Sequence, residues 1–572
     1  MAISDTHSLI NPDNGFCSKT FIYHSLRPPY PLPPQSSPFS ITDFVFSLLQ
    51  TAVTPTASLI DAAMHSRIPY DDLRLLVRNL SASFRRPPLS LSHGACAFVI
   101  SPNSSHLPIL YLSLFSIGVV VSPSNPVSSV QEISCQIELC RPVVAFAAAE
   151  SVRKLSEAGF SNPVVLIGLN EFEQDRAGGC TNGPQKDWNV PDFESMMRFE
   201  SKGAGSGPEV EVWQSDTAAI LYSSGTTGKV KGVKLTHRNL ISSVAGAFSG
   251  RRSTSSSSLA AVYLCTVPYF HIYGFTLCLR AVAFGESIVS MSRFDLRSML
   301  RSIEEFRVTR LAVAPPVVVA LVDRNNDGLV EGSNWRSLET VYSGGAPLTV
   351  AVINKFMRRF PNVSISQSYG LTETTGGVSR VVGLYESTKI GSVGRLVSHC
   401  EAKIVDPKTG VGLAPTNPGE LWIRGPFVMK GYVHGKDTMV ESDGWLKTGD
   451  LCYFDNEGFL FVVDRLKELI KYKGYQVPPA ELEHILHSHP DITEAAVIPY
   501  PDEEVGEVPM GFVVRRRGTD IDEAQVKAFV AEKVAPYKKL RRVRFVDSIP
   551  KNAPGKILRK RVDKIGALGS YL

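Results

Sequence analysis

Hydrophobic positions along this 572-residue chain fall into two patterns that alternate with each other. Short runs rich in β-branched residues, typical of buried strands, occur at residues 97–100, 118–121, 143–147, 164–167, 218–222, 287–291 and 311–314. Segments with helical spacing separate these runs, and a further helix is expected from about His237. Strands that alternate with helices predict stacked α/β layers with parallel sheets.

The pattern changes toward the C-terminus. Beyond residue 415 the strands become shorter and are separated by turn residues, as in 419–425. After Asp464 and Arg465, a strand, a helix over 479–489 and a strand over 495–499 predict a small α+β domain. Because the chain is too long for one core, we predict a large domain over 41–463 and a small one over 464–572. Residues 1–40, rich in Pro and Ser, are expected to form a surface extension.

Composition and charge argue against several classes of protein. The net charge of +5 is small for this length, so we interpret the basic run 538–544 as a solvated face and predict no nucleic-acid partner. Nine cysteines without C-x-x-C spacing argue against a disulfide framework or a zinc site. The most apolar stretch, 107–121, is too short to cross a bilayer and predicts a buried helix that runs into a strand. We expect neither a membrane span nor a secretory signal.

One segment carries a strong chemical signature. Residues 222–232 read Tyr-Ser-Ser-Gly-Thr-Thr-Gly-Lys-Val-Lys-Gly and follow a predicted strand. Glycines and hydroxyl residues let backbone N–H groups and side-chain hydroxyls surround phosphate oxygens, while a lysine neutralises charge. The segment is not a Walker A loop, because Gly225 and Gly228 lie too close together and Val230 follows Lys229. For this segment alone, a Ser/Gly linker is the alternative interpretation.

The loop resembles the phosphate loop of the acyl-adenylate-forming superfamily, with Val230 where the family pattern has Pro. Further family motifs follow in order at residues 344–348, 367–373, 448–450, 463–476 and 554–556. The resemblance implies stacked α/β layers, a small β-barrel-like subdomain and a mobile C-terminal domain with a hinge near Asp464. Residues 268–273, 468–474, 502–509 and 534–538 are similar to plant 4-coumarate–CoA ligases and their ligase-like relatives.

The resemblance implies ATP-dependent adenylation of a carboxylic acid, with Mg²⁺ as cofactor. Lys231 and Lys556 are expected to neutralise phosphate and carboxylate charge, and Glu373 to bind Mg²⁺. Asp450 and Arg465 are expected at the ribose, where a carboxylate accepts strong hydrogen bonds. The other residues implied at ATP or AMP are Ser223, Ser224, Gly225, Thr226, Thr227, Gly228, Gly345, Ala346, Pro347, Gln367, Ser368, Tyr369, Gly370, Thr372, Lys467, Lys471 and Gln476.

The resemblance further implies transfer of the acyl group to the thiol of CoA. In this step the C-terminal domain rotates, Lys556 leaves, and Lys473 and Gly474 approach the thiol. His271 is expected to gate access of the thiol, and Arg293 to lie near a CoA phosphate. We expect the partners to be an acid, ATP and CoA, and the protein to be a monomer.

The acyl pocket is expected to differ from that of true 4-coumarate ligases. Its implied lining residues are His271, Tyr273, Gly344, Ser368, Gly376 and Gly377. Ser368 replaces a glycine of those enzymes, and the two glycines stand where they carry Pro and a larger apolar residue. Two substrate classes therefore stay open: 4-coumarate or a related phenylpropanoid acid, and a medium-chain or cyclopentanone-type fatty acid of the kind that precedes jasmonate.

Two further questions concern location and catalysis. Ser570, Tyr571 and Leu572 resemble a peroxisomal address with Tyr in place of a basic residue, so both peroxisome and cytosol stay open. A non-enzymatic binding module would be expected to lack Lys556 or Glu373, and both are present. The sequence therefore favours an active ligase.

Overall fold

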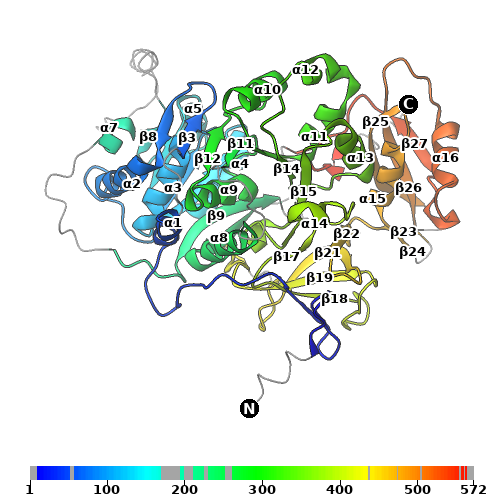
Figure 1. The fold of residues 1–572 in the computed structure, drawn as a ribbon, viewed down its shortest axis with the longest axis horizontal. Helices are drawn as coiled ribbons and strands as arrows, with labels where there is room; N and C mark the ends of the chain where they lie inside the picture. Colours follow the sequence, from blue (N-terminus) through cyan, green and yellow to red (C-terminus); the bar gives the residue numbers. More distant parts are fainter. Residues whose placement is uncertain are drawn as a thin grey trace.

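The computed structural model describes residues 9–51, 57–168, 193–198, 210–224, 230–251, 261–435, 439–472, 475–502, 506–552, 555–559 and 561–562. Three sheets with their helices form the larger part of the molecule, coloured blue to yellow in Figure 1. A fourth sheet lies in the smaller C-terminal part, coloured orange to red (Figure 1). Within these residues no helix is long and apolar enough to cross a membrane.

A seven-stranded sheet carries the segment that leads into the phosphate loop. In spatial order its strands are β20 (Gly431–Tyr432), β10 (Val230–Thr236), β9 (Thr217–Ser224), β6 (Val120–Ser124), β5 (Cys96–Ile100), β7 (Val144–Ala147) and β8 (Val164–Leu166). Strands β9 to β8 are parallel, while β10 runs antiparallel to both of its neighbours. The accompanying helices are α2 (Tyr70–Phe84), α3 (His106–Ser116), α4 (Val130–Cys140), α5 (Ala149–Glu157) and α7 (Phe193–Arg198).

A nine-stranded sheet forms the second layer. Its order is β17 (Arg395–Leu396), β16 (Ser379–Arg380), β15 (Ser364–Tyr369), β14 (Thr340–Ser343), β13 (Arg310–Val313), β11 (Val262–Cys265), β12 (Ser287–Ser290), β3 (Ser58–Asp61) and β4 (Arg67–Pro69). One large apolar core includes side chains of both sheets and of the helices α1 (Ile41–Leu49), α8 (His237–Arg251) and α9 (Ile272–Ala283). A second core joins the nine-stranded sheet to α10 (Leu296–Glu305), α11 (Pro315–Val322), α12 (Asp327–Glu331) and α13 (Val350–Arg359). Between α11 and α12 lies the short helix η2 (Arg324–Asn326).

The third sheet is antiparallel and has six strands. Its order is β1 (Phe16–Cys17), β2 (Ile22–His24), β18 (Glu401–Val405), β19 (Gly419–Arg424), β21 (Leu446–Phe454) and β22 (Leu460–Arg465). This sheet stands where the sequence predicts a barrel-like subdomain. Two short helices, η3 (Thr372–Thr374) and α14 (Gly383–Ser387), lie in the chain between β15 and β17.

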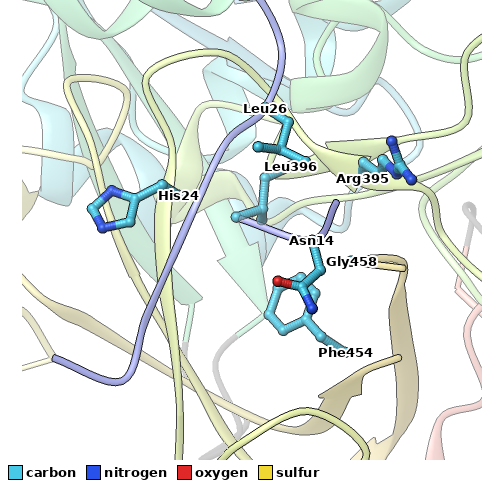
Figure 2. A pocket seen from close by; sticks show the side chains of 7 residues that line it. All are labelled: Asn14, His24, Leu26, Arg395, Leu396, Phe454 and Gly458. Atoms are coloured by element: carbon cyan, nitrogen blue, oxygen red, sulfur yellow. The ribbon is translucent and has the colours of Figure 1, made fainter. Parts of the chain in front are cut away.

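The N-terminal segment belongs to this sheet. Tyr23 is fully buried and stacks on Phe454, with ring centroids 4.2 Å apart. Figure 2 shows Asn14, His24 and Leu26 beside Arg395, Leu396, Phe454 and Gly458, around a small pocket. The main chain of Asn14 approaches Gly458 so closely that a Cβ at Gly458 would lie 2.8 Å from its carbonyl oxygen. Within the predicted surface extension, residues 16–24 thus contribute two strands to a sheet.

The C-terminal part has its own core around a mixed five-stranded sheet, antiparallel except for one parallel pair of strands. It contains β23 (Ile470–Tyr472), β24 (Tyr475–Val477), β25 (Ile492–Asp502), β26 (Gly506–Arg515), β27 (Arg542–Phe545), α15 (Pro479–His487), η4 (Pro536–Lys538) and α16 (Glu523–Ala531). The predicted α/β fold with a large N-terminal and a small α+β C-terminal part is confirmed. The predicted strands and the helix from His237 are present, and 107–121 forms α3 followed by β6.

Asp464, which the sequence suggests as the hinge, lies inside β22 and pairs with Leu451. Its carboxylate accepts hydrogen bonds from the backbone N–H of Arg465 (2.7 Å) and from that of Ala480 (2.8 Å), in the first turn of α15. Burial raises the pKa of this carboxyl to about 6. The chain leaves the six-stranded sheet after Arg465, so residues 466–469 connect it to the C-terminal sheet.

Candidate active site

The two strands that flank the phosphate loop place Ser223 opposite Lys231. The loop residues Gly225, Thr226, Thr227 and Gly228 lie outside the described residues, as does the side chain of Ser224. The Ser223 hydroxyl donates a hydrogen bond to Glu373 Oε1 at 3.0 Å. The base of the loop is therefore joined to the segment 372–374, which the sequence predicts for Mg²⁺.

Glu373 has a second donor that the motifs did not indicate. The Tyr432 hydroxyl donates to the same Oε1 at 2.9 Å, and the Lys231 ammonium lies 4.7 Å from the centroid of the Tyr432 ring. No described residue donates a hydrogen bond to the other oxygen, Oε2. Mg²⁺ in nucleotide sites is held by one or two carboxylates together with phosphate oxygens and water. One buried carboxylate with an available oxygen fits this requirement, and no larger cluster of metal-ligating side chains occurs in the described residues.

The residues predicted for the ribose are assembled around Asp450. This carboxylate is 3% exposed and accepts a hydrogen bond from the Tyr369 hydroxyl at 2.5 Å. The Arg465 Nε lies 3.2 Å from its other oxygen. Burial raises the pKa of Asp450, while Arg465, Tyr369 and Lys556 act in the opposite direction. Both carboxylate oxygens thus have protein partners that fix their orientation, and each keeps lone pairs for ribose hydroxyls.

The C-terminal lysine segment is docked against the large domain. Gly555 adopts a left-handed φ of +85°, and a Cβ on it would lie 2.4 Å from the ring of Pro316 at the start of α11. The Lys556 side chain is partly buried near Arg465, Asp450 and Glu468. Burial lowers the pKa of Lys556, the charge of Arg465 adds to this, and the two carboxylates oppose it. The structure therefore brings a lysine from the far end of the chain to the predicted ribose site.

Arg559 holds this segment in place. Its Nε donates to Glu468 Oε2 at 2.8 Å, its Nη2 to Glu483 Oε2 at 3.1 Å, and its Nη1 to the Val497 carbonyl at 2.6 Å. Nη1 also contacts Glu483 Oε1. Glu468 belongs to the connection between the two parts of the molecule, and Glu483 belongs to α15. We call Glu468, Glu483 and Arg559 the Arg559 cluster.

The segment predicted for adenine is a turn that follows β14. Gly345 has a φ of +88°, a conformation that favours glycine, and it is exposed together with Pro347. Ala346 is partly exposed. Gln367, on the neighbouring strand β15, donates from its amide to the Ser392 carbonyl at 3.3 Å. Gly370 lies so close to the Gly376 carbonyl that a Cβ there would be 1.9 Å from it, which explains the need for glycine.

The residues predicted for CoA are less completely described. His271 caps α9, and its Nδ1 accepts the backbone N–H of Tyr273 at 3.3 Å. Burial lowers the pKa of His271 to about 4, so its imidazole is neutral near pH 7. Arg293 is exposed on the surface. Lys473, Gly474 and the side chain of Gln476 lie outside the described residues, whereas Lys467 and Lys471 are exposed.

The predicted acyl residues meet beside the adenine turn. A Cβ on Gly344 would lie 3.1 Å from Ser368 Oγ and 3.5 Å from the Tyr273 ring. Gly376 has a φ of +90° and faces Thr276 of α9. At Gly377 a Cβ would meet nothing within 4 Å, in agreement with the expected open space. Leu277, which follows Thr276 in α9, is 2% exposed and belongs to the main core.

Comparison with known proteins places this arrangement in a family. The model of AMP-binding enzymes matches residues 50–433, and that of the AMP-binding enzyme C-terminal domain matches residues 481–556. The chain is 46% identical over 575 residues to 4-coumarate–CoA ligase-like 9 of Arabidopsis thaliana, with 98% of each chain covered. It is 41% identical over 567 residues to the peroxisomal OPC-8:0-CoA ligase 1 of Arabidopsis thaliana, covering 98% of this chain and 100% of that protein.

Solved structures agree with this placement. The o-succinylbenzoate coenzyme A synthetase of Bacillus subtilis, in complex with ATP and magnesium ion, superimposes with a TM-score of 0.73 at 25% identity. The match covers 91% of this chain and 99% of that one. The chain therefore belongs to the AMP-binding enzyme family, and it is an adenylate-forming enzyme of the acyl-CoA ligase type. Within that family it is similar over nearly its whole length to plant 4-coumarate–CoA ligase-like proteins, as the motifs predict.

Proposed function

We propose that this protein joins a carboxylic acid to CoA in two steps that ATP drives. The observation that carries the proposal is the position of Lys556, which docking of Gly555 on Pro316 brings to Asp450 and Arg465. A lysine so placed suits the reaction of two anions, the carboxylate of the acid and the α-phosphate of ATP. Glu373, Ser223 and Lys231 stand beside the phosphate loop, where the rest of the triphosphate would lie.

In the first step, a carboxylate oxygen of the acid attacks the α-phosphorus, the acyl–AMP bond forms, and pyrophosphate leaves. Asp450 and Arg465 hold the ribose, while Lys556 and Lys231 neutralise charge at the reacting oxygens. When bound, Mg²⁺ would supply charge neutralisation at the phosphates, and Glu373 is the residue that would hold it. These residue roles are part of the proposal.

In the second step, the sulfur of CoA attacks the acyl carbon, the thioester forms, and AMP leaves. If Lys556 acts in the first step from its present place near Asp450 and Arg465, the C-terminal part has to move before CoA reaches the acyl carbon. His271, which is neutral near pH 7, suits orientation of the thiol through a hydrogen bond rather than through charge. Residues 466–469, which connect the two sheets, are where the chain can turn.

Two classes of acid are candidates. The names of the relatives support 4-coumarate or a related phenylpropanoid acid. The open space at Gly377 and the similarity to a peroxisomal OPC-8:0-CoA ligase support a medium-chain or cyclopentanone-type fatty acid. That relative also supports a peroxisomal location, with the cytosol as the alternative; the terminal residues 570–572 lie outside the described residues.

The function is tested by mixing purified protein with ATP, Mg²⁺ and each acid of a panel drawn from both classes. Pyrophosphate should be released without CoA, and mass spectrometry should detect acyl-AMP. Adding CoA should convert that acyl-AMP to a thioester and release AMP. If no acid in the panel yields pyrophosphate above the acid-free background, the proposed function is wrong.

A further inference from the structure

One face of helix α9 is less deeply buried than the rest of the helix. Almost every residue of this helix is buried, yet Tyr273, Thr276 and Arg280 keep partial exposure. Their spacing of three and four residues places them on one face. Tyr273 packs at Gly344 and Thr276 at Gly376, both of which belong to the predicted acyl site. The third residue of this face, Arg280, therefore lies further along the same side.

The position of Arg280 sets a length scale. Seven residues of helix separate it from Tyr273, which corresponds to about 10 Å along the axis. Its Nη2 donates to the Tyr263 hydroxyl at 3.2 Å. Among the described residues no carboxylate lies within ion-pair distance of its guanidinium, and no other side chain accepts from it. A cation in such an interior position is costly unless it meets an anion or acceptor.

A second arginine, Arg380, lies close enough to Arg280 to be affected by its charge. Arg380 of β16 pairs through its backbone with Ser368, another predicted acyl residue. Its Nη2 donates to the carbonyls of Gly246 (3.2 Å) and Ala247 (2.9 Å) in α8. Its Nε is buried and hydrogen-bonds to no described residue. Burial, together with the charges of Arg27 and Arg280, lowers the pKa of Arg380 to about 10.

Helices α8 and α9, which carry these contacts, lie side by side at their C-terminal ends. Phe248, which follows the Ala247 carbonyl, contacts Phe284 at the C-terminal end of α9, with ring centroids 5.2 Å apart. Arg280 is four residues before Phe284. The two guanidinium groups thus lie near the C-terminal halves of α8 and α9.

Burial works against the charge of Arg280, yet its pKa is raised, and the Glu286 carboxylate is among the groups that raise it. Glu286 nevertheless lies beyond ion-pair distance of Arg280. Arg27 is paired with Glu386 at 2.7 Å, and Arg310 with Glu286 at 2.9 Å. Each of those arginines has its own carboxylate, whereas the described residues offer none within ion-pair distance to Arg280 or Arg380. An acyl chain that enters from Gly344 and passes Thr276 would reach this positive end with its far terminus.

We propose that Arg280 and Arg380 bind the far end of the acyl substrate, and that the substrates are acids whose chain ends in a carbonyl or carboxylate oxygen. This inference rests on the proposed ligase function and specifies its substrate class. A plain alkyl end would leave both guanidinium groups buried without a new partner, whereas an oxygen acceptor would receive charge-assisted hydrogen bonds.

The test compares three acids of equal length: octanoate, 7-oxooctanoate and octanedioate. For the wild-type protein we expect kcat/KM for at least one of the two oxygen-ended acids to exceed that for octanoate by roughly 10–100-fold, the scale of one charge-assisted hydrogen bond. The comparison of ketone with dicarboxylate shows which acceptor is used. Arg280→Met should reduce this ratio by at least tenfold, and Arg280→Lys should restore part of it.

Arg310→Lys is the matched control. Arg310 also donates to the Tyr263 hydroxyl at 3.2 Å, but it is paired with Glu286, so this variant should keep the wild-type ratio. Thermal unfolding identifies variants that do not fold. If Arg280→Met is one of them, the inference is judged on the kcat/KM ratio of the wild type and on that of Arg380→Lys. Equal or better use of octanoate by the wild type, or an unchanged ratio in Arg280→Met, would overturn the inference and leave the ligase function standing. Absence of pyrophosphate with all three acids and with the wider panel would instead refute the ligase function.

Discussion

We expect Arg559 to be a positioning residue for adenylation. Its side chain is 16% exposed, and its guanidinium reaches Glu483 with two nitrogens and Glu468 with the third. Burial works against its charge, but the attraction of Glu483 and Glu468 outweighs it and raises the pKa of Arg559. Arg559→Met would leave the two carboxylates without this cation and would release the segment that carries Lys556.

The expected loss of adenylation in Arg559→Met follows from the burial of the ion pair between Arg559 and Glu483. Breaking a buried ion pair by removing one partner costs about 3–5 kcal/mol. If that cost falls on the docked position of residues 555–559, the fraction of molecules ready for adenylation falls about 10²–10⁴-fold. Conversion of supplied acyl-adenylate and CoA to thioester should fall far less, because that step does not require Lys556 at the ribose site.

The assay measures pyrophosphate release and thioester formation separately for Arg559→Met. Lys551→Met is the matched control, since Lys551 forms a bridge with Ile557 in the same hairpin but pairs with Glu494 on the surface. A surface pair contributes about 0–1 kcal/mol, so this control should adenylate nearly as the wild type does. A folded Arg559→Met protein with wild-type adenylation would refute the positioning role. A parallel loss of both half-reactions would show a general structural role instead.

Three further changes test other parts of the site. Tyr432→Phe removes a donor to Glu373 and should raise the Mg²⁺ concentration needed for half-maximal adenylation by about tenfold. The control Tyr385→Phe removes a donor to Glu457 and should leave that concentration unchanged. Equal Mg²⁺ dependence of adenylation in the two variants would contradict the role of Tyr432. Gly377→Val fills the open space and should lower kcat/KM for sinapate or a medium-chain acid about tenfold while sparing 4-coumarate. Ser368→Gly should have the reverse effect. If the order of kcat/KM for the three acids stays the same in both variants, these positions do not line the pocket. The pKa of the Asp464 carboxyl is raised to about 6 in the folded protein, so its ionisation destabilises the fold. The free energy of unfolding of the wild type should therefore fall by about 2–3 kcal/mol relative to that of Asp464→Asn as the pH rises from 4 to 6. A difference in urea midpoint that stays constant over this range would contradict that assignment.

Much of the fold could be predicted from sequence because the parallel strands are buried on both faces. Such strands are short apolar runs, which is why β5, β7, β8 and β12 were readable directly. Strands β1 and β2 could not be predicted, since they are two and three residues long and β2 pairs with β18, far along the chain. Their place depends on tertiary pairing rather than on local pattern.

In the site, too, some contacts follow from sequence motifs and others depend on tertiary structure. Motif residues such as Ser223 and Glu373, or Asp450 and Arg465, lie in contact. Tyr432 lies in a two-residue strand outside the motifs, and only the fold brings its hydroxyl to Glu373. Arg280 is a single charge in an apolar helix, where sequence alone does not distinguish an inward from an outward direction. Sequence motifs therefore marked residues that the fold brings together near Asp450 and Glu373, but they gave no sign of Tyr432 or Arg280.

The most direct test of the account separates the two half-reactions in Lys556→Ala. The account predicts that pyrophosphate release falls about 10²–10³-fold, the scale for removal of one charge-stabilising group. The same protein, supplied with acyl-adenylate and CoA, should form thioester at the wild-type rate. Equal loss of both half-reactions, or adenylation at the wild-type rate, would contradict the assignment of Lys556 to the first step.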